Sequence, residues 1–208
     1  GGGTLTFNGS VTQSDANSTI TNSGVAGDIY FNDGYIRSAG TFTSMSGEDI
    51  YVTTEFTNSG TSLTLDPGSN FYVYDDAAIN PSASVALGNI TINTGKVFSM
   101  GGDFSVAGAW TNNGTTLPGS STVTFNATTS KTIAGTAATQ DFYNIIVALT
   151  AGQTLSVAGS TTTLNTNNLT MTTGNFSAGT ASTMNVGGDL TISSGTYTAG
   201  TTTNLTGS

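Results

Sequence analysis

A four-residue pattern with alternating apolar positions recurs along this chain at a spacing of 21 residues. In the first half it reads Asp28-Ile29-Tyr30-Phe31, Asp49-Ile50-Tyr51-Val52 and Asn70-Phe71-Tyr72-Val73. Near the C-terminal end a related pair, residues 168–174 and 189–195, keeps the same spacing. A fixed period of this length is typical of repeat architectures, in which each unit buries its apolar face against its neighbours.

The apolar residues of this pattern form a ladder that we expect to stack as one core column. Its members are Ile29, Ile50, Phe71, Ile90, Val123, Ile145, Leu169 and Leu190. The successive steps are 21, 21, 19, 33, 22, 24 and 21 residues. The long step predicts an irregular insertion around residues 96–120, which holds Trp110, Pro118 and a partial copy of the pattern at residues 102–106.

Each unit contains three short runs of period-two alternation, separated by the turn-forming residues Gly, Asn and Asp. Three strands in a unit of 20–21 residues predict an all-β fold, a parallel β-solenoid of roughly ten turns without helices of note. The 42 Thr, 24 Ser and 19 Asn also favour strands and turns over helix interiors. The rival fold, an antiparallel sandwich, requires no repeated tetrapeptide. We expect residues 1–208 to form a single continuous solenoid.

The residue inventory excludes several kinds of chemistry. Without His or Cys, the chain cannot build a His/Cys zinc site, a thiol nucleophile or a Ser-His-Asp triad. Its net charge of −9 disfavours nucleic acids and anionic membrane surfaces, and no apolar run is long enough to span a bilayer. Acidic pairs are the minimum for glycoside cleavage, but two Lys and one Arg offer little to hold an acidic polysaccharide. We therefore expect no enzymatic activity, no cofactor, no nucleic-acid partner and no membrane insertion.

Acidic residues at predicted corners are candidate calcium ligands, because hard carboxylate oxygens attract Ca²⁺. The candidates are Asp66, Asp75 and Asp76. A solvated acidic turn is the alternative that we favour, since the sequence lacks the glycine-rich calcium-binding nonapeptide. A second acidic set shares the repeat position of Asn70 and predicts a ladder of carboxylates along the rod, screened by solvent. Its members are Asp28, Glu48 and Asp49.

Tyrosines in the first half form a candidate binding surface for sugars, because aromatic faces suit pyranose rings. These are Tyr30, Tyr35, Tyr51, Tyr72 and Tyr74. The alternative that we favour is a ladder of rings stacked for stability. Threonine pairs at alternate positions do not share one repeat phase, so the flat array of an ice-binding solenoid is not expected.

Residues 124–136 (TFNATTSKTIAGT) and 142–147 (FYNIIV) resemble the Thr- and Gly-rich repeats of large secreted bacterial surface proteins. These repeats are regarded as parallel β-helices, similar to adhesins and autotransporter passengers. The resemblance covers the C-terminal half, whereas the N-terminal half shares only the period. It implies an extracellular or cell-surface location, an adhesive or structural role and no catalytic residues.

The two ends of the sequence predict association between copies. Residues 1–7 begin almost directly as a strand and residues 203–206 end as one, with no helix or polar repeat to cover the exposed backbone. The absence of an initiating Met and of a signal region indicates a processed or excised segment. We expect head-to-tail contacts through Leu5, Phe7 and Leu205 that build a filament, sheath or surface layer. The alternative function is an adhesin segment of a longer protein that binds a surface glycan.

Overall fold

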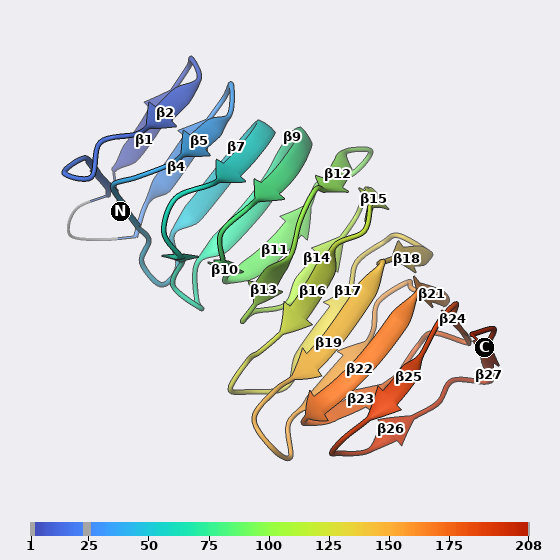
Figure 1. Cartoon of the computed structure of the whole chain (residues 1–208). Helices are drawn as coiled ribbons and strands as arrows, with labels where there is room; N and C mark the ends of the chain where they lie inside the picture. Colours follow the sequence, from blue (N-terminus) through green and yellow to red (C-terminus); the bar gives the residue numbers. More distant parts are fainter. Residues whose placement is uncertain (1–2, 23–25, 208) are drawn as a thin grey trace.

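The computed structural model describes residues 3–22 and 26–207 as a parallel β-solenoid of about 9 turns with about 21 residues per turn (Figure 1). The predicted fold class is thus confirmed, with nine turns in place of roughly ten. Gly1, Gly2, residues 23–25 and Ser208, all within the domain expected at 1–208, lie outside the described part. Within that part, no helix has the length and hydropathy that a membrane span requires.

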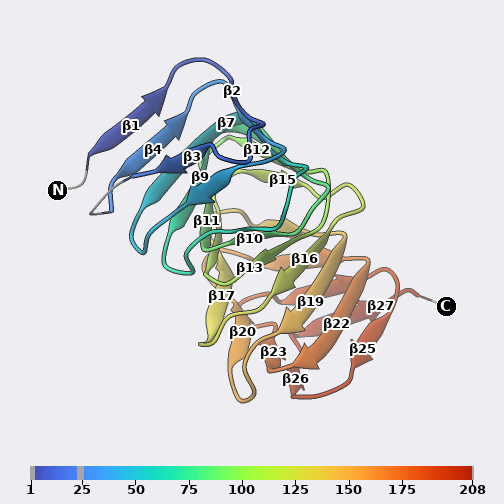
Figure 2. The ribbon, with the colours of Figure 1, turned by 60° about the vertical axis from the view of Figure 1, so that its left-hand side comes forward.

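Each turn contributes three strands, which lie in three columns along the rod (Figures 1 and 2). Strands of successive turns pair in parallel, and this pairing is interrupted once in the second column and once in the third. The first column contains β1 (Thr4–Phe7), β4 (Asp28–Phe31), β7 (Asp49–Asn58), β9 (Asn70–Pro81), β11 (Asn89–Ile92), β14 (Trp110–Asn112), β17 (Lys131–Ala134), β20 (Thr154–Val157), β23 (Asn175–Ser177) and β26 (Tyr197–Thr198). The second contains β2 (Val11–Gln13), β5 (Tyr35–Arg37), the second halves of β7 and β9, β12 (Val97–Met100), β15 (Thr115–Leu117), β18 (Thr139–Asp141), β21 (Thr163–Thr166), β24 (Thr183–Val186) and β27 (Thr202–Leu205). The third contains β3 (Thr19–Thr21), β6 (Thr41–Thr43), β8 (Leu63–Thr64), β10 (Val85–Leu87), β13 (Phe104–Val106), β16 (Thr122–Phe125), β19 (Asn144–Ala148), β22 (Asn168–Thr173) and β25 (Leu190–Ile192).

The predicted alternation places one side of every internal strand in a continuous core. Ile29, Ile50 and Phe71 pair in register on neighbouring turns, and each is at most 1% exposed. The residues that alternate with these core residues along each strand face outward and are half-buried or exposed. Because a three- to five-residue strand buries too little surface alone, each turn depends on its neighbours for its core.

The predicted ladder is correct over its first four members and changes column at the fifth. Ile90 pairs with Trp110 rather than with Val123, and this column continues through Ile133 and Val157. The remaining four members pair with one another in the third column, and they are Val123, Ile145, Leu169 and Leu190. Both columns carry the same polar-apolar alternation, so the sequence pattern alone does not distinguish them.

Residues 96–120, where an irregular insertion is expected, continue the regular stack. They contain strands β12 to β15, and each of these pairs with strands of neighbouring turns. Ile90 and Trp110 are paired residues only 20 positions apart. The step of 33 residues in the ladder is therefore a change of column and not an insertion.

The corners between strands require glycine where one turn lies directly on the next. Gly179 has a φ of +52°, in the left-handed region that L side chains rarely adopt. A Cβ at this position would also fall on the carbonyl oxygen of Val157 in the preceding turn. Both the backbone conformation and the close approach therefore exclude larger residues there.

Arg37 is a buried cation that joins two turns of the second column. Its side chain is 4% exposed, and no carboxylate of the described residues lies within ion-pair distance of it. The guanidinium instead donates to Asn58 Oδ1 at 2.7 Å, to the Thr61 carbonyl at 2.8 Å and to the Gly40 carbonyl at 2.6 Å. These bonds fix the position of two neighbouring corners and compensate part of the cost of burying the charge.

Candidate functional site

Three tyrosines stack on the outer face of the first column. Tyr30, Tyr51 and Tyr72 occupy paired positions on β4, β7 and β9, where alternation directs them outward. The ring centroids lie 4.3 Å and 4.8 Å apart, with interplanar angles of 4° and 11°. Burial, and secondarily the nearby Asp49 carboxylate, raises the pKa of Tyr51 and of Tyr72, so both phenols remain protonated at neutral pH.

Tyr74 has the most exposed ring of the five predicted tyrosines. Tyr35 points into the core and is 0% exposed, so it is not part of the predicted surface. Both faces of Tyr51 are covered by its neighbours in the stack. Tyr74, in contrast, is 49% exposed and meets Tyr51 and Tyr30 at interplanar angles of 85° and 87°. The stacked ladder is thus observed, and Tyr74 lies along its side.

A row of acidic and amide side chains runs beside the tyrosines. Asp28 pairs in register with Asp49, and Asp49 pairs with Asn70. Asn70 Nδ2 donates to Asp49 Oδ1 at 2.7 Å, and Asn89 Nδ2 donates to Asn70 Oδ1 at 3.0 Å. Glu48 does not join this row because its side chain is fully buried. The predicted acidic ladder therefore contains two carboxylates and continues as amides.

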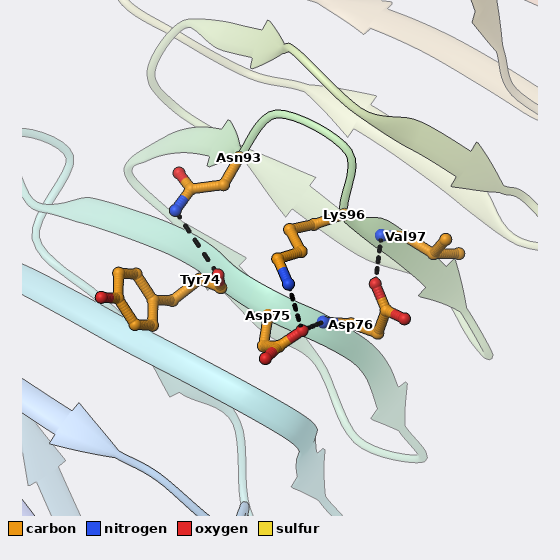
Figure 3. Close-up of polar contacts among 6 residues, drawn as sticks. All are labelled: Tyr74, Asp75, Asp76, Asn93, Lys96 and Val97. Carbon is orange, nitrogen blue, oxygen red and sulfur yellow. Dashed lines mark hydrogen bonds and ion pairs between the residues drawn. The ribbon is translucent and has the colours of Figure 1, made fainter.

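Residues 74–76 form a corner between the two paired halves of β9. This corner carries the ion pair found among the described residues (Figure 3). Lys96 Nζ donates to Asp75 Oδ1 at 2.7 Å, and the Val97 amide donates to Asp76 Oδ1 at 2.8 Å. Hydrogen bonds from Lys96 and from the Asp76 amide lower the pKa of Asp75. The side chains of Lys96 and Asp75 are 36% and 57% exposed, so solvent screens the ion pair and it adds little to stability.

A shallow polar groove lies at this corner. It has a volume of about 560 Å³ and is lined by Tyr74, Asp75, Asn93, Thr94, Lys96 and Asn113. The groove combines amide, hydroxyl and charged groups, which supply hydrogen bonds. It is open to solvent and contains no pair of carboxylates flanking a buried cavity, as acid-base catalysis on a sugar would need.

The three calcium candidates do not converge. Asp75 and Asp76 lie within β9, whereas Asp66 lies at the preceding corner, where its Oδ1 accepts a hydrogen bond from the Gly68 amide at 2.8 Å. Among the described residues, no group of three or more His, Cys, Asp or Glu side chains is placed to hold a metal ion. Asp66 thus lies one short stretch of strand before the other two acids, as the sequence indicates, and the first residues of β9 separate them.

The two ends of the described solenoid expose parts of its core columns. Leu5 and Phe7 of β1 are only partly buried, and Leu205 of β27 is 56% exposed. Residues not predicted as contacts share this property. They are Val11 and Ile20 in the first turn and Leu190, Ile192 and Tyr197 in the last. The repeat pattern places these residues at inward positions, and this is the signal by which the sequence could have identified them as end contacts.

These features define the chain as a parallel β-solenoid repeat protein with an outward tyrosine ladder. A scan against protein-family models matches none, and searches of curated proteins and of solved structures likewise return no match.

Proposed function

We propose that the chain is an extracellular structural protein whose solenoids associate end to end into a filament, sheath or surface layer. One observation carries this proposal. The core columns continue to both ends of the described solenoid, and their terminal residues are partly exposed there. The first and last turns therefore offer the same kind of surface that each internal turn buries against its neighbour.

The strand edges support the same association. β1 pairs only with β4, and β27 pairs only with β24, so each has one edge without a strand partner in the described chain. Such edges present unpaired N–H and C=O groups that can template a further parallel strand. The Tyr197 ring stacks on Phe176 at 5.8 Å and leaves its opposite face available to a following turn. A second copy continues the existing coil-to-coil packing without a new type of contact.

The sides of the rod suit a structural role in an aqueous environment. Outward positions are dominated by Thr, Ser and Asn, and the tyrosine rings mainly contact one another. The low Lys content and the Thr- and Gly-rich composition favour a secreted surface protein. The extracellular location is part of the proposal and rests on this composition.

The proposal is tested by measuring assembly of the purified chain with analytical ultracentrifugation and electron microscopy. We expect rods longer than one solenoid of about 45 Å, a length that follows from the strand spacing. Leu205→Lys places a charge at the open end and should weaken association at least tenfold. Leu117→Lys is the matched control, because Leu117 is 53% exposed on the side of the rod.

Two results contradict the proposal. One is a wild-type chain that stays monomeric at all concentrations, and the other is equal loss of assembly in both leucine variants. A denaturing gel of the native material could instead show a single giant polypeptide. In that case the terminal turns would pack against neighbouring turns of one longer chain, and not against a second copy.

A further inference from the structure

We propose that the Tyr74 corner binds a neutral polysaccharide, with the Tyr74 ring as stacking platform and the adjacent groove as the polar part of the site. The inference is independent of end-to-end association, because Tyr74 lies on β9, the fourth of the ten strands in the first column (Figure 1).

The Tyr74 ring is held in place with one face outward. The faces of Tyr51 are already covered, so Tyr74 meets Tyr51 and Tyr30 along their ring edges, at centroid distances of 5.6 Å and 6.4 Å. This leaves the opposite side of the Tyr74 ring in solvent, consistent with its 49% exposure. Sugars present C–H groups that pack on an aromatic face. A ring already positioned by two neighbours loses little conformational entropy when a sugar binds.

The polar groups of the groove follow the ring in consecutive turns. Val73, Ile92 and Asn112 are paired residues, so Tyr74, Asn93 and Asn113 occupy the same corner of three successive turns. At a strand spacing of about 4.8 Å, this row extends on the order of 10 Å along the rod. A chain ligand aligned with the rod can therefore contact the ring and both amides.

The two amides have hydrogen-bonding capacity directed outward. Asn113 Oδ1 accepts from the amide and hydroxyl of Thr136 at 3.0 Å and 3.2 Å, while its Nδ2 donates to no group of the described residues. Asn93 Nδ2 makes only a long contact of 3.5 Å with the Tyr74 carbonyl. Hydroxyl groups of a sugar are both donors and acceptors, so they fit such amides.

Charge selects the neutral class of ligand. Lys96 is neutralised by Asp75, and Asp76 adds an unpaired negative charge at the same corner. The whole chain carries a net charge of −9. Uronic acids and sulfated glycans are repelled by this field, whereas uncharged hexose polymers are not.

The test is affinity gel electrophoresis of the purified 208-residue chain in gels containing laminarin, mannan, dextran or hydroxyethylcellulose, with polygalacturonic acid as the acidic arm. We expect at least one neutral polymer to retard the protein and the acidic polymer to leave it unaffected. Tyr74→Ala and Asn113→Ala should each weaken binding, the first at least tenfold. Tyr74→Phe should bind like the wild type, since it keeps the ring face.

Tyr143→Ala is the control, because Tyr143 is 38% exposed away from the groove. Circular dichroism of each variant checks the fold, and Asn113→Ala provides a second variant if Tyr74→Ala does not fold. The inference is overturned if no neutral polymer retards the wild type, if folded Tyr74→Ala and Asn113→Ala bind normally, or if polygalacturonic acid binds best. Because rod assembly is measured separately, failure here leaves the structural proposal standing.

Discussion

Glu48 is a carboxylic acid enclosed at the corner before β7. The Met45 amide donates to its Oε2 at 3.1 Å, but Oε1 has no hydrogen-bond partner among the described residues. Burial raises the pKa of Glu48 above its ordinary value of 4.5, and the hydrogen bond from Met45 opposes this shift only in part. The native state therefore holds the proton to a higher pH than the unfolded chain does. Stability from this group is fully present below about pH 4.5 and is lost as the pH rises through the raised native pKa.

We predict that Glu48→Gln reduces the loss of stability between acidic and neutral pH and makes the folded state more stable at neutral pH. Urea unfolding midpoints, measured for wild type and variant at several pH values, check this. Glu55→Gln is the control, because Glu55 lies at an outward position of β7 and is only half-buried. An unchanged pH dependence in Glu48→Gln would show that the acid is not the group responsible.

At the scale of the strand, the sequence predicts the repeat well and the column poorly. The three tetrapeptides at residues 28–31, 49–52 and 70–73 differ little, so their common register was visible. Trp110 occupies the position in the first column where the earlier turns have Ile or Phe, so it does not match their pattern. Val123 belongs to the third column, but its run of residues resembles the earlier repeats. Alternation records which side of a strand is buried but not which column the strand joins.

The candidate site was predictable to a similar degree. The tyrosine period was visible, but alternation does not reveal that Tyr35 points inward or that Tyr51 is covered on both faces.

An outward amide ladder on strands β18, β21, β24 and β27 gives an element-level prediction. Asn165 donates to Asp141, Asn185 donates to Asn165 and Asn204 donates to Asn185, each at 2.7 Å. Asp141 only accepts, so a carboxylate is suited to the first position. Internal members must both donate and accept, which a carboxylate cannot do.

Asn165→Asp should therefore destabilise the protein by about 1–2 kcal/mol, because it removes a donor and sets two carboxylates side by side on adjacent strands. Asp141→Asn is the matched control and should be neutral or slightly stabilising. Thermal unfolding at neutral pH compares the two. Equal effects would show that the ladder bonds do not contribute to stability.

For the whole molecule, nearest-neighbour packing predicts uneven unfolding. Internal turns contact two neighbours, whereas the last described turn contacts one, and its strand β25 is half-buried or exposed throughout. Trp110, the single tryptophan, is 0% exposed in a central turn, in contact with Phe98, Phe125 and Phe142.

We predict that far-UV circular dichroism, which reports all turns, begins to change at a lower urea concentration than Trp110 fluorescence does. Coincident transitions from the two probes would indicate that the solenoid unfolds as one cooperative unit.

Every described strand pair is parallel, so all turns advance in the same sense. The two faces of a turn are consequently different surfaces, and a head-to-head junction cannot reproduce the internal packing. A polymer built by the proposed packing would have two different ends, which can add subunits at different rates. Such directionality would let a cell control elongation by blocking a single terminus.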